Sequence, residues 1–239
     1  MSDTLRPQDA AAADWRMTHF CGRQQCHRPG DFDEVVFYAL GEKFLVDAGC
    51  GECVLLDEER TDEFDTTLGD AASCAEAEGG ARRALRRMIL VRAGPAPYLA
   101  ILDVNEKEGR PFAAEVLWRT DAGNRISLDA DGRFVIRGVE NICAAEVLWP
   151  RAPAPALALA ESRGGPQVSL SLTAPVVETL AVFCPRRARE PRPRFSCRRD
   201  GRAAFSVTCD LAGSASVLRC SAATDRPLSA PKPVRLQSR

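Results

Sequence analysis

Short runs in which apolar and polar residues alternate recur along most of the chain, with turn residues between them. Two of these runs, 34–39 (EVVFYA) and 43–48 (KFLVDA), flank Leu40-Gly41-Glu42. This arrangement predicts a β-hairpin, because glycine readily adopts the positive φ of a tight reversal. Short strands at near-regular spacing predict an all-β fold: a large antiparallel β-sandwich (a two-sheet supersandwich) of about 12–14 strands with little helix. The further strand candidates are 53–56, 84–92, 97–103, 112–119, 125–128, 133–137, 142–149, 155–160, 167–173, 176–184, 194–198, 203–209 and 215–220.

The order of these runs predicts one β-sandwich domain over 15–221, since all-β domains of this size commonly fold as one unit. Residues 1–14 are expected to be a flexible N-terminus and 222–239 a disordered tail. The acidic stretch 57–80 is predicted to be a long exposed loop. The stretch 185–202, with its many arginines and three prolines, is predicted to connect strands.

Composition narrows the classes of partner. The formal net charge is -1, so no overall field draws the chain to nucleic acid or to a membrane surface. No apolar run approaches the ~20 residues of a membrane-spanning helix. The N-terminal residues do not resemble a secretory signal. The chain as written is therefore expected in the cytoplasm, whereas a fragment that had lost its leader would come from an exported protein.

Most residues that could bind a metal ion or take part in catalysis lie between Cys21 and Cys53. If the hairpin reverses near residue 41, Cys50 lies opposite Asp33 and Cys53 opposite Gly30. Cysteine, histidine and carboxylate side chains then converge at one rim of the sheet. These residues are Cys26, His27, Asp31, Asp47, Cys50 and Cys53.

Three interpretations of this rim stay open. The cysteines can be small residues of a turn, with His27 exposed. Alternatively, Cys50-x-x-Cys53 together with Cys21-x4-Cys26, or with His27, supplies the four nitrogen and sulfur ligands that tetrahedral zinc prefers. Zinc is thus the candidate metal. In the third interpretation, the rim is a carbohydrate site.

The third interpretation rests on a resemblance. The segment 27–49, HRPGDFDEVVFYALGEKFLVDAG, resembles the start of the C-terminal domain of the heparinase II/III family. The family pattern there is His-Arg-His-x-Asp, a strand, a Gly-Glu/Lys turn, a second strand and Asp-x-Gly. His27, Arg28 and Asp31 match the first element, and Asp47 begins the closing one. Later segments, 82–106 and 170–185, resemble family strands.

The resemblance implies β-elimination on uronate-containing polysaccharides. That chemistry needs a neutralised carboxylate, a base for the C5 proton and an acid for the leaving oxygen. His27 is then the catalytic candidate, since a histidine titrates near neutrality. Arg28 and Asp31 are substrate-binding candidates. Asp47 is left as a metal ligand of a degraded site, because Pro29 stands where the family has its second histidine and no histidine follows His27.

The resemblance also implies a missing half. In the family, an N-terminal α/α-toroid supplies a catalytic tyrosine, whereas Tyr38 and Tyr98 both lie in predicted strands. The isolated chain is therefore expected to be inactive without a toroid domain or chain. Two alternatives remain: a non-catalytic carbohydrate-binding or assembly module, and a zinc-stabilised β-protein of unrelated function. The arginines of 185–202 do not indicate nucleic-acid binding, because only Phe195 among them could stack on a base.

Overall fold

The structure, a computed structural model, describes residues 15–20, 34–47, 54–70, 83–107, 111–129, 131–150, 156–162, 164–222 and 234–238. All regular structure within these ranges is β-strand, and the strands pair antiparallel, which confirms the predicted fold class. Among the described residues there is no helix of the length and apolar character needed to cross a membrane.

The strands form four sheets. The N-terminal sheet has the order β1(Arg16–Phe20), β2(Glu34–Ala39), β3(Glu42–Asp47). The eight-stranded central sheet has the order β4(Val54–Arg60), β5(Phe64–Asp70), β6(Arg83–Val91), β7(Tyr98–Glu106), β14(Val176–Arg187), β11(Asn141–Trp149), β10(Arg133–Arg137), β9(Arg125–Leu128). The β8 sheet has the order β12(Leu157–Ser162), β13(Gly165–Ala174), β8(Phe112–Arg119), and the C-terminal sheet the order β15(Arg194–Gly201), β16(Ala204–Leu211), β17(Ser214–Ser221), β18(Val234–Ser238).

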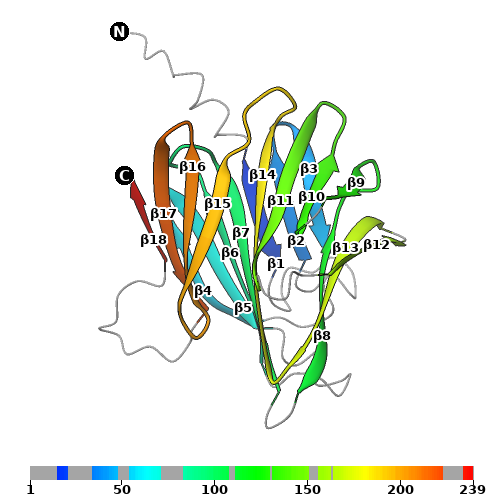
Figure 1. Cartoon of the computed structure of the whole chain (residues 1–239), viewed down its shortest axis with the longest axis vertical. Coiled ribbons are helices and arrows are strands. Elements are labelled where there is room, and N and C mark those ends of the chain that lie inside the picture. The colour runs from blue at the N-terminus through cyan, green and yellow to red at the C-terminus, as the bar shows by residue number, and fades with distance from the viewer. Residues whose placement is uncertain are drawn as a thin grey trace.

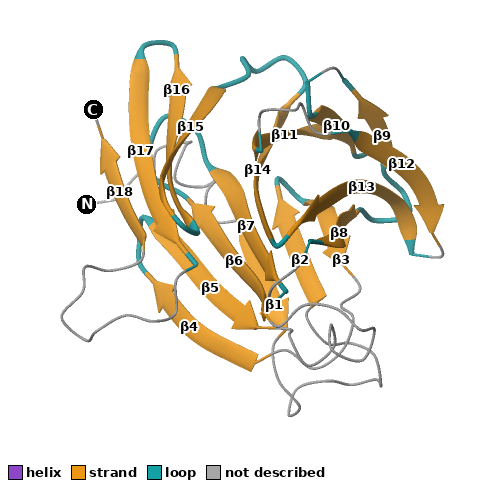
Figure 2. Ribbon diagram, turned by 60° about the horizontal axis from the view of Figure 1, so that its bottom comes forward, coloured by secondary structure: helices purple, strands orange, loops and turns teal. Residues whose placement is uncertain are grey.

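The central sheet is covered on both faces, so the sandwich has three layers where the sequence predicted two (Figures 1 and 2). One face packs against the C-terminal sheet, where Leu180 and Phe205 share a buried cluster. The other face packs against the N-terminal and β8 sheets, where Phe37 and Trp118 share a second cluster with Ala181. Strands buried on both faces read as continuous apolar runs, as in the LAVFC stretch of β14.

The β2–β3 hairpin confirms the first prediction from the sequence. Its turn is Leu40-Gly41, with φ of 54° and 79°, a pair of positive values typical of a two-residue hairpin loop. Val35 pairs with Asp47, one position away from the expected register. The turn lies at Leu40-Gly41, so Ala39 pairs with Glu42, and a bulge between Phe37 and Tyr38 then shifts the pairing by one residue toward the expected register. A bulge of this kind cannot be read from alternation alone.

Glu42 fastens this hairpin to the central sheet. Its carboxylate accepts hydrogen bonds from the backbone N–H groups of Val139 (3.0 Å), Glu140 (2.8 Å) and Asn141 (3.0 Å), in the turn between β10 and β11. Gly138 makes this approach possible, since a Cβ there would lie 1.5 Å from a Glu42 oxygen. We call this contact the Glu42 latch.

The prediction of a loop over 57–80 is wrong for residues 57–70, which form most of β4 and all of β5. The acidic residues lie beside an arginine-rich strand and pair with it. Asp57 accepts from Arg87 at 2.9 Å, and Asp65 accepts from both terminal nitrogens of Arg92. This hydrogen-bonded ion pair raises the pKa of Arg92 above its usual value. Composition suggested solvation, but the acidic residues meet arginines of β6 or of the residue that follows it, and Arg87 reaches Asp57 across β5.

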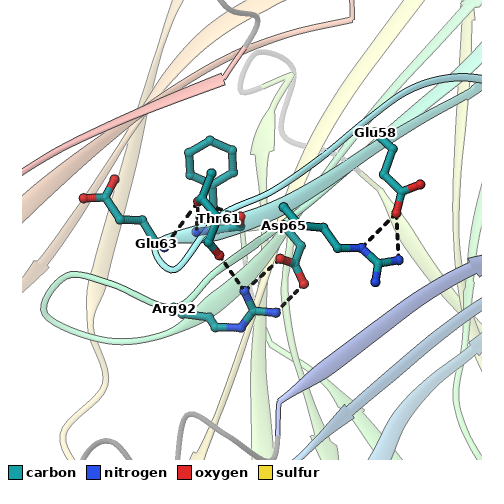
Figure 3. A network of polar contacts seen from close by, with 7 residues as sticks. Glu58, Thr61, Glu63, Asp65 and Arg92 are labelled. Atoms are coloured by element: carbon teal, nitrogen blue, oxygen red, sulfur yellow. Dashed lines mark hydrogen bonds and ion pairs between the residues drawn. The ribbon is translucent and has the colours of Figure 1, made fainter.

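Thr61 closes the turn between β4 and β5 (Figure 3). Its hydroxyl accepts from the N–H of Phe64 at 3.0 Å and donates to the carbonyl of the same residue at 2.9 Å. Arg92 also donates to the Thr61 carbonyl at 3.3 Å. The turn is thus satisfied by local polar groups, which explains a tight reversal without glycine.

Three further differences concern the ends of the chain and the Arg/Pro-rich stretch. β1 occupies Arg16–Phe20, where no strand was predicted. β18 occupies Val234–Ser238, within the predicted disordered tail, and pairs with β17. Most of 185–202 lies in β14 and β15, and only the residues between those strands form a connection. The described residues therefore contain 18 strands.

Candidate functional site

The two segments that carry most of the candidate chemistry attach to one end of the N-terminal sheet. β1 ends at Phe20, β2 begins at Glu34 and β3 ends at Asp47, so 21–33 and 48–53 both start from this end. The residues of those segments, Cys26, His27, Arg28, Asp31, Cys50 and Cys53, lie outside the described residues, and their roles stay predictions. In the pairing register, His19, Val35 and Asp47 form one row across the sheet.

The same end of the molecule collects strand ends from the central sheet, and we call it the rim. The Glu42 latch places the β2–β3 turn beside the start of β11, where Asn141 pairs with Arg187 of β14. The open end of the hairpin therefore points toward the same side of the molecule as the opposite ends of these strands, where β14 begins at Val176 (Figure 1). The central-sheet residues at the rim are Val54, Asp70, Arg83, Glu106 and Val176.

A buried carboxylate joins two layers near the rim. The Glu178 side chain on β14 is 5% exposed. It accepts from the Arg199 guanidinium at 2.8 Å and from the backbone N–H of Ala203 at 2.7 Å. The guanidinium of Arg199 also lies over the ring of Trp149, 5.8 Å from its centroid. Because its oxygens are occupied by donors of the same chain, Glu178 fastens the C-terminal sheet to the central sheet and does not offer a free acid or base.

Two arginines of β6 are also neutralised by carboxylates. Arg86 donates to Asp103 at 2.6 Å, with side-chain exposures of 14% and 6%. Arg87, whose side chain is 1% exposed, pairs with Asp57 and donates to the Thr66 hydroxyl at 3.1 Å. Arginines held in this way contribute to packing, and their charge is not available to an anionic ligand.

Both tyrosines lie in strands, as the sequence predicted. Tyr98 is fully buried on β7, and its ring meets Phe195 edge-on with centroids 5.1 Å apart. Burial raises the pKa of Tyr98 well above its usual value, so its hydroxyl stays protonated and cannot serve as a general base at neutral pH. Tyr38 on β2 is half-buried.

The five cysteines that the structure describes are all free thiols, and four of them are buried. Burial raises the pKa of Cys184, Cys209 and Cys220 to about 12 each, and that of Cys143 well above its usual value. Protonated thiols do not bind metal, so these cysteines act as small apolar residues. Within the described ranges no cluster of histidine, cysteine and carboxylate side chains could hold a metal ion. The zinc prediction concerns residues outside those ranges.

Sequence reasoning missed two contacts. One is the Glu42 latch, and the other is the set of bonds from Glu178 to Arg199 and Ala203, which we call the Glu178 clamp. The signal for Glu178 was a carboxylate inside an otherwise apolar strand, since such a charge needs a partner when buried. Glu42 gave no such signal, because an exposed-looking glutamate after a turn glycine is common. Its partners lie 97 to 99 residues further along the chain.

These observations define an antiparallel β-sandwich of three layers. The fold is similar to that of a heparan sulfate lyase, a HepC mutant from Pedobacter heparinus, with a TM-score of 0.64 over 83% of this chain and 38% of that chain. The sequence identity is 12%, so the likeness concerns the fold. The matched region is thus well under half of the lyase. No protein-family model and no curated protein sequence matches the chain.

Proposed function

We propose that the chain is a heparinase II/III-like β-sandwich module of a protein that acts on acidic, uronate-containing polysaccharide by β-elimination. The observation that carries the proposal is the similarity of fold to a heparan sulfate lyase over 83% of the chain. The motif between His27 and Gly49, whose hairpin forms as the resemblance predicted, adds independent support.

In this proposal the rim forms one wall of the polysaccharide cleft. His27 removes or returns a proton near the scissile bond, which suits an imidazole that titrates near neutrality. Arg28 holds the uronate carboxylate through paired N–H donors, and Asp31 binds the neighbouring sugar. The arrangement of β1, β2 and β3 supports this assignment, because the segments bearing these residues leave the sheet at one end.

The module is proposed to work with a helical toroid domain or chain. The fold match covers 38% of the lyase chain, and Tyr98 is too deeply buried to transfer a proton. An apolar strip at the rim supports docking of such a partner. Val54, Leu55 and Leu56 begin the edge strand β4 with exposures of 59%, 44% and 44%, more apolar surface than a solvated edge usually presents.

The test is an assay for unsaturated sugar products on a panel of uronate polymers. The chain is assayed alone and together with a helical protein encoded beside it. We expect ultraviolet absorbance to rise only with both proteins. His27→Ala should lower the rate by roughly 10²–10⁴-fold, the usual contribution of a positioned acid or base. His19→Ala is the matched control. An unchanged rate for His27→Ala, or no product from any polymer with both proteins present, contradicts the proposal.

A non-catalytic carbohydrate-binding module is the second candidate. Pro29 at the position of the family's second histidine favours it, as does the packing of Tyr98 in the core. Glycan binding that persists in His27→Ala, without product formation by wild-type protein and partner together, would identify this function.

A further inference from the structure

Three arginines form a row across the outer face of the C-terminal sheet, the layer furthest from the N-terminal sheet (Figure 2). The pairing register aligns Arg198 with Ser206, Ser206 with Arg219 and Arg219 with Arg235. Residues directly opposite one another in a sheet project from the same face, so the three guanidinium groups share one side. All three side chains are exposed. We call this the arginine row.

Within the described residues, the charge of the row is largely uncompensated. Arg198 pairs with Asp200 at 2.9 Å, but neither Arg219 nor Arg235 makes an ion pair with any residue in the described ranges. Like charges directly opposite each other weaken a sheet. Arg86 and Arg199 each lie against a carboxylate. Arg219 and Arg235 lack such a partner in the described ranges, as do Arg125 and Arg137 on β9 and β10. An opposed pair of this kind is suited to an external anion, and the polar groups beside Arg219 and Arg235 distinguish the arginine row from the pair on β9 and β10.

A second row of polar groups runs beside the first. Ser196, Thr208, Val217 and Gln237 align on the same face, two residues away along each strand. This distance is about 6.8 Å, and neighbouring strands are about 4.8 Å apart. Val217 is 6% exposed, so the accessible groups of the row are two hydroxyls and an amide. The face thus presents a line of cations beside a line of neutral hydrogen-bonding groups.

We propose that this face binds a linear acidic polysaccharide laid across the strands. Guanidinium groups pair with sulfate or carboxylate oxygens through parallel N–H donors, and the neighbouring row binds sugar hydroxyls. The choice of a uronate polymer rests on the proposed function. It adds to that function a second surface, on the layer opposite the one from which the segment with His27 leaves. Such a surface keeps a long polymer attached while the rim moves along it.

Two other anionic partners fit the face less well. Nucleic acid binding without sequence preference uses aromatic rings as stacking platforms, whereas Phe195 and Phe205 point into the core. A membrane surface is met by basic residues together with exposed apolar side chains. None of the large exposed apolar residues of the described ranges belongs to the C-terminal sheet.

The test compares two double variants of the full chain in binding to heparin oligosaccharides of defined length. Arg219→Gln/Arg235→Gln removes two charges of the row. The matched control is Arg125→Gln/Arg137→Gln, since these exposed arginines also lie directly opposite each other, on β9 and β10. We expect the first double variant to bind about tenfold more weakly or worse and to lose part of the salt dependence, because fewer counterions are released. The control should bind like wild type.

Three outcomes would overturn the inference. The row and control variants could bind equally well, or the wild-type protein could fail to bind heparin and alginate. In the third outcome, a DNA duplex of matched charge binds as tightly as the polysaccharide. The last outcome would identify a general polyanion surface. Failure of the proposed function is seen separately. In that case, oligosaccharide binding still depends on Arg219 and Arg235, but no unsaturated product forms with any partner.

Discussion

The central sheet is held by different chemistry on its two faces. Towards the N-terminal and β8 sheets, aromatic rings meet one another: Phe134 lies 5.9 Å from Phe183 and 6.0 Å from Trp118, measured between centroids. Towards the C-terminal sheet, the buried layer includes the Arg87 and Glu178 side chains and three thiols. The first interface depends on shape, whereas the second also depends on which groups carry charge. The two layers should therefore respond differently to pH and to substitution.

Alkaline pH should produce the largest difference. The folded-state pKa of Cys184, Cys209 and Cys220 is about 12, above the ordinary value of 9.0. Their contribution to stability is thus complete below pH 9 and is lost as pH rises from 9 towards 12. Each thiol changes the free energy of unfolding by up to about 1.4 kcal/mol per pH unit in this window. We expect the environment of Trp149, at the C-terminal interface, to change at lower pH than that of Trp118.

Single-tryptophan variants allow this to be measured by fluorescence during a pH titration. Cys209→Ala should move the Trp149 transition to higher pH, and Cys143→Ala, on the other face, should move it less. Coincident transitions for both tryptophans in all variants would show that the layers open together and that the comparison is wrong.

Removing an aromatic ring should have the next largest effect. Phe183 is fully buried between Trp118 and Phe134, so Phe183→Ala should lower the free energy of unfolding by about 3–5 kcal/mol through lost burial and a residual cavity. Phe195→Ala, on the edge strand β15, should cost less because that site is 9% exposed and can relax. Urea unfolding measures both values. Equal losses would contradict the distinction between the two interfaces.

The Glu178 clamp should show a smaller effect. Glu178→Gln keeps an acceptor for the N–H of Ala203 but removes the charge that pairs with Arg199. The Arg199 side chain is 43% exposed, so water screens part of the loss, and we expect about 1–2 kcal/mol in urea unfolding. Tyr98→Phe is the contrasting control. It removes a buried hydroxyl without a hydrogen-bond partner among the described residues, and stability should change by less than about 1 kcal/mol. An unchanged stability for Glu178→Gln would rule out the clamp.

Alternation of apolar and polar residues predicted most of the fold. The bounds of β8, β9 and β10 agree with the predicted strands to the residue, because β8 and β10 each have one buried face and clear turn signals bound β9. β5 was missed because its acidic residues indicated a solvated loop, whereas Asp65 pairs with Arg92, which directly follows the next strand, β6. The third layer could not be predicted, since alternation does not say which face of a strand is covered by what.

The candidate site was predictable only in outline. The hairpin placed Asp47 at the end of β3, as the structure does, with a register one residue from the predicted one. The roles of His27, Arg28 and Asp31 came from resemblance and stay predictions. The Glu42 latch depends on a contact between distant segments, which local pattern does not reveal.

The Glu42 latch also has a consequence for synthesis of the protein. The hairpin forms from neighbouring residues, but the turn that receives its carboxylate is made 97 to 99 residues later. Closing so long a stretch of chain is entropically costly and slow. A ribosome adds about 5–20 residues per second, so for roughly 5–20 s the hairpin exists before the β10–β11 turn that donates hydrogen bonds to Glu42. During that interval Phe37 and Phe44 have no apolar cover from β11, and the nascent chain is then most exposed to chaperones and to self-association.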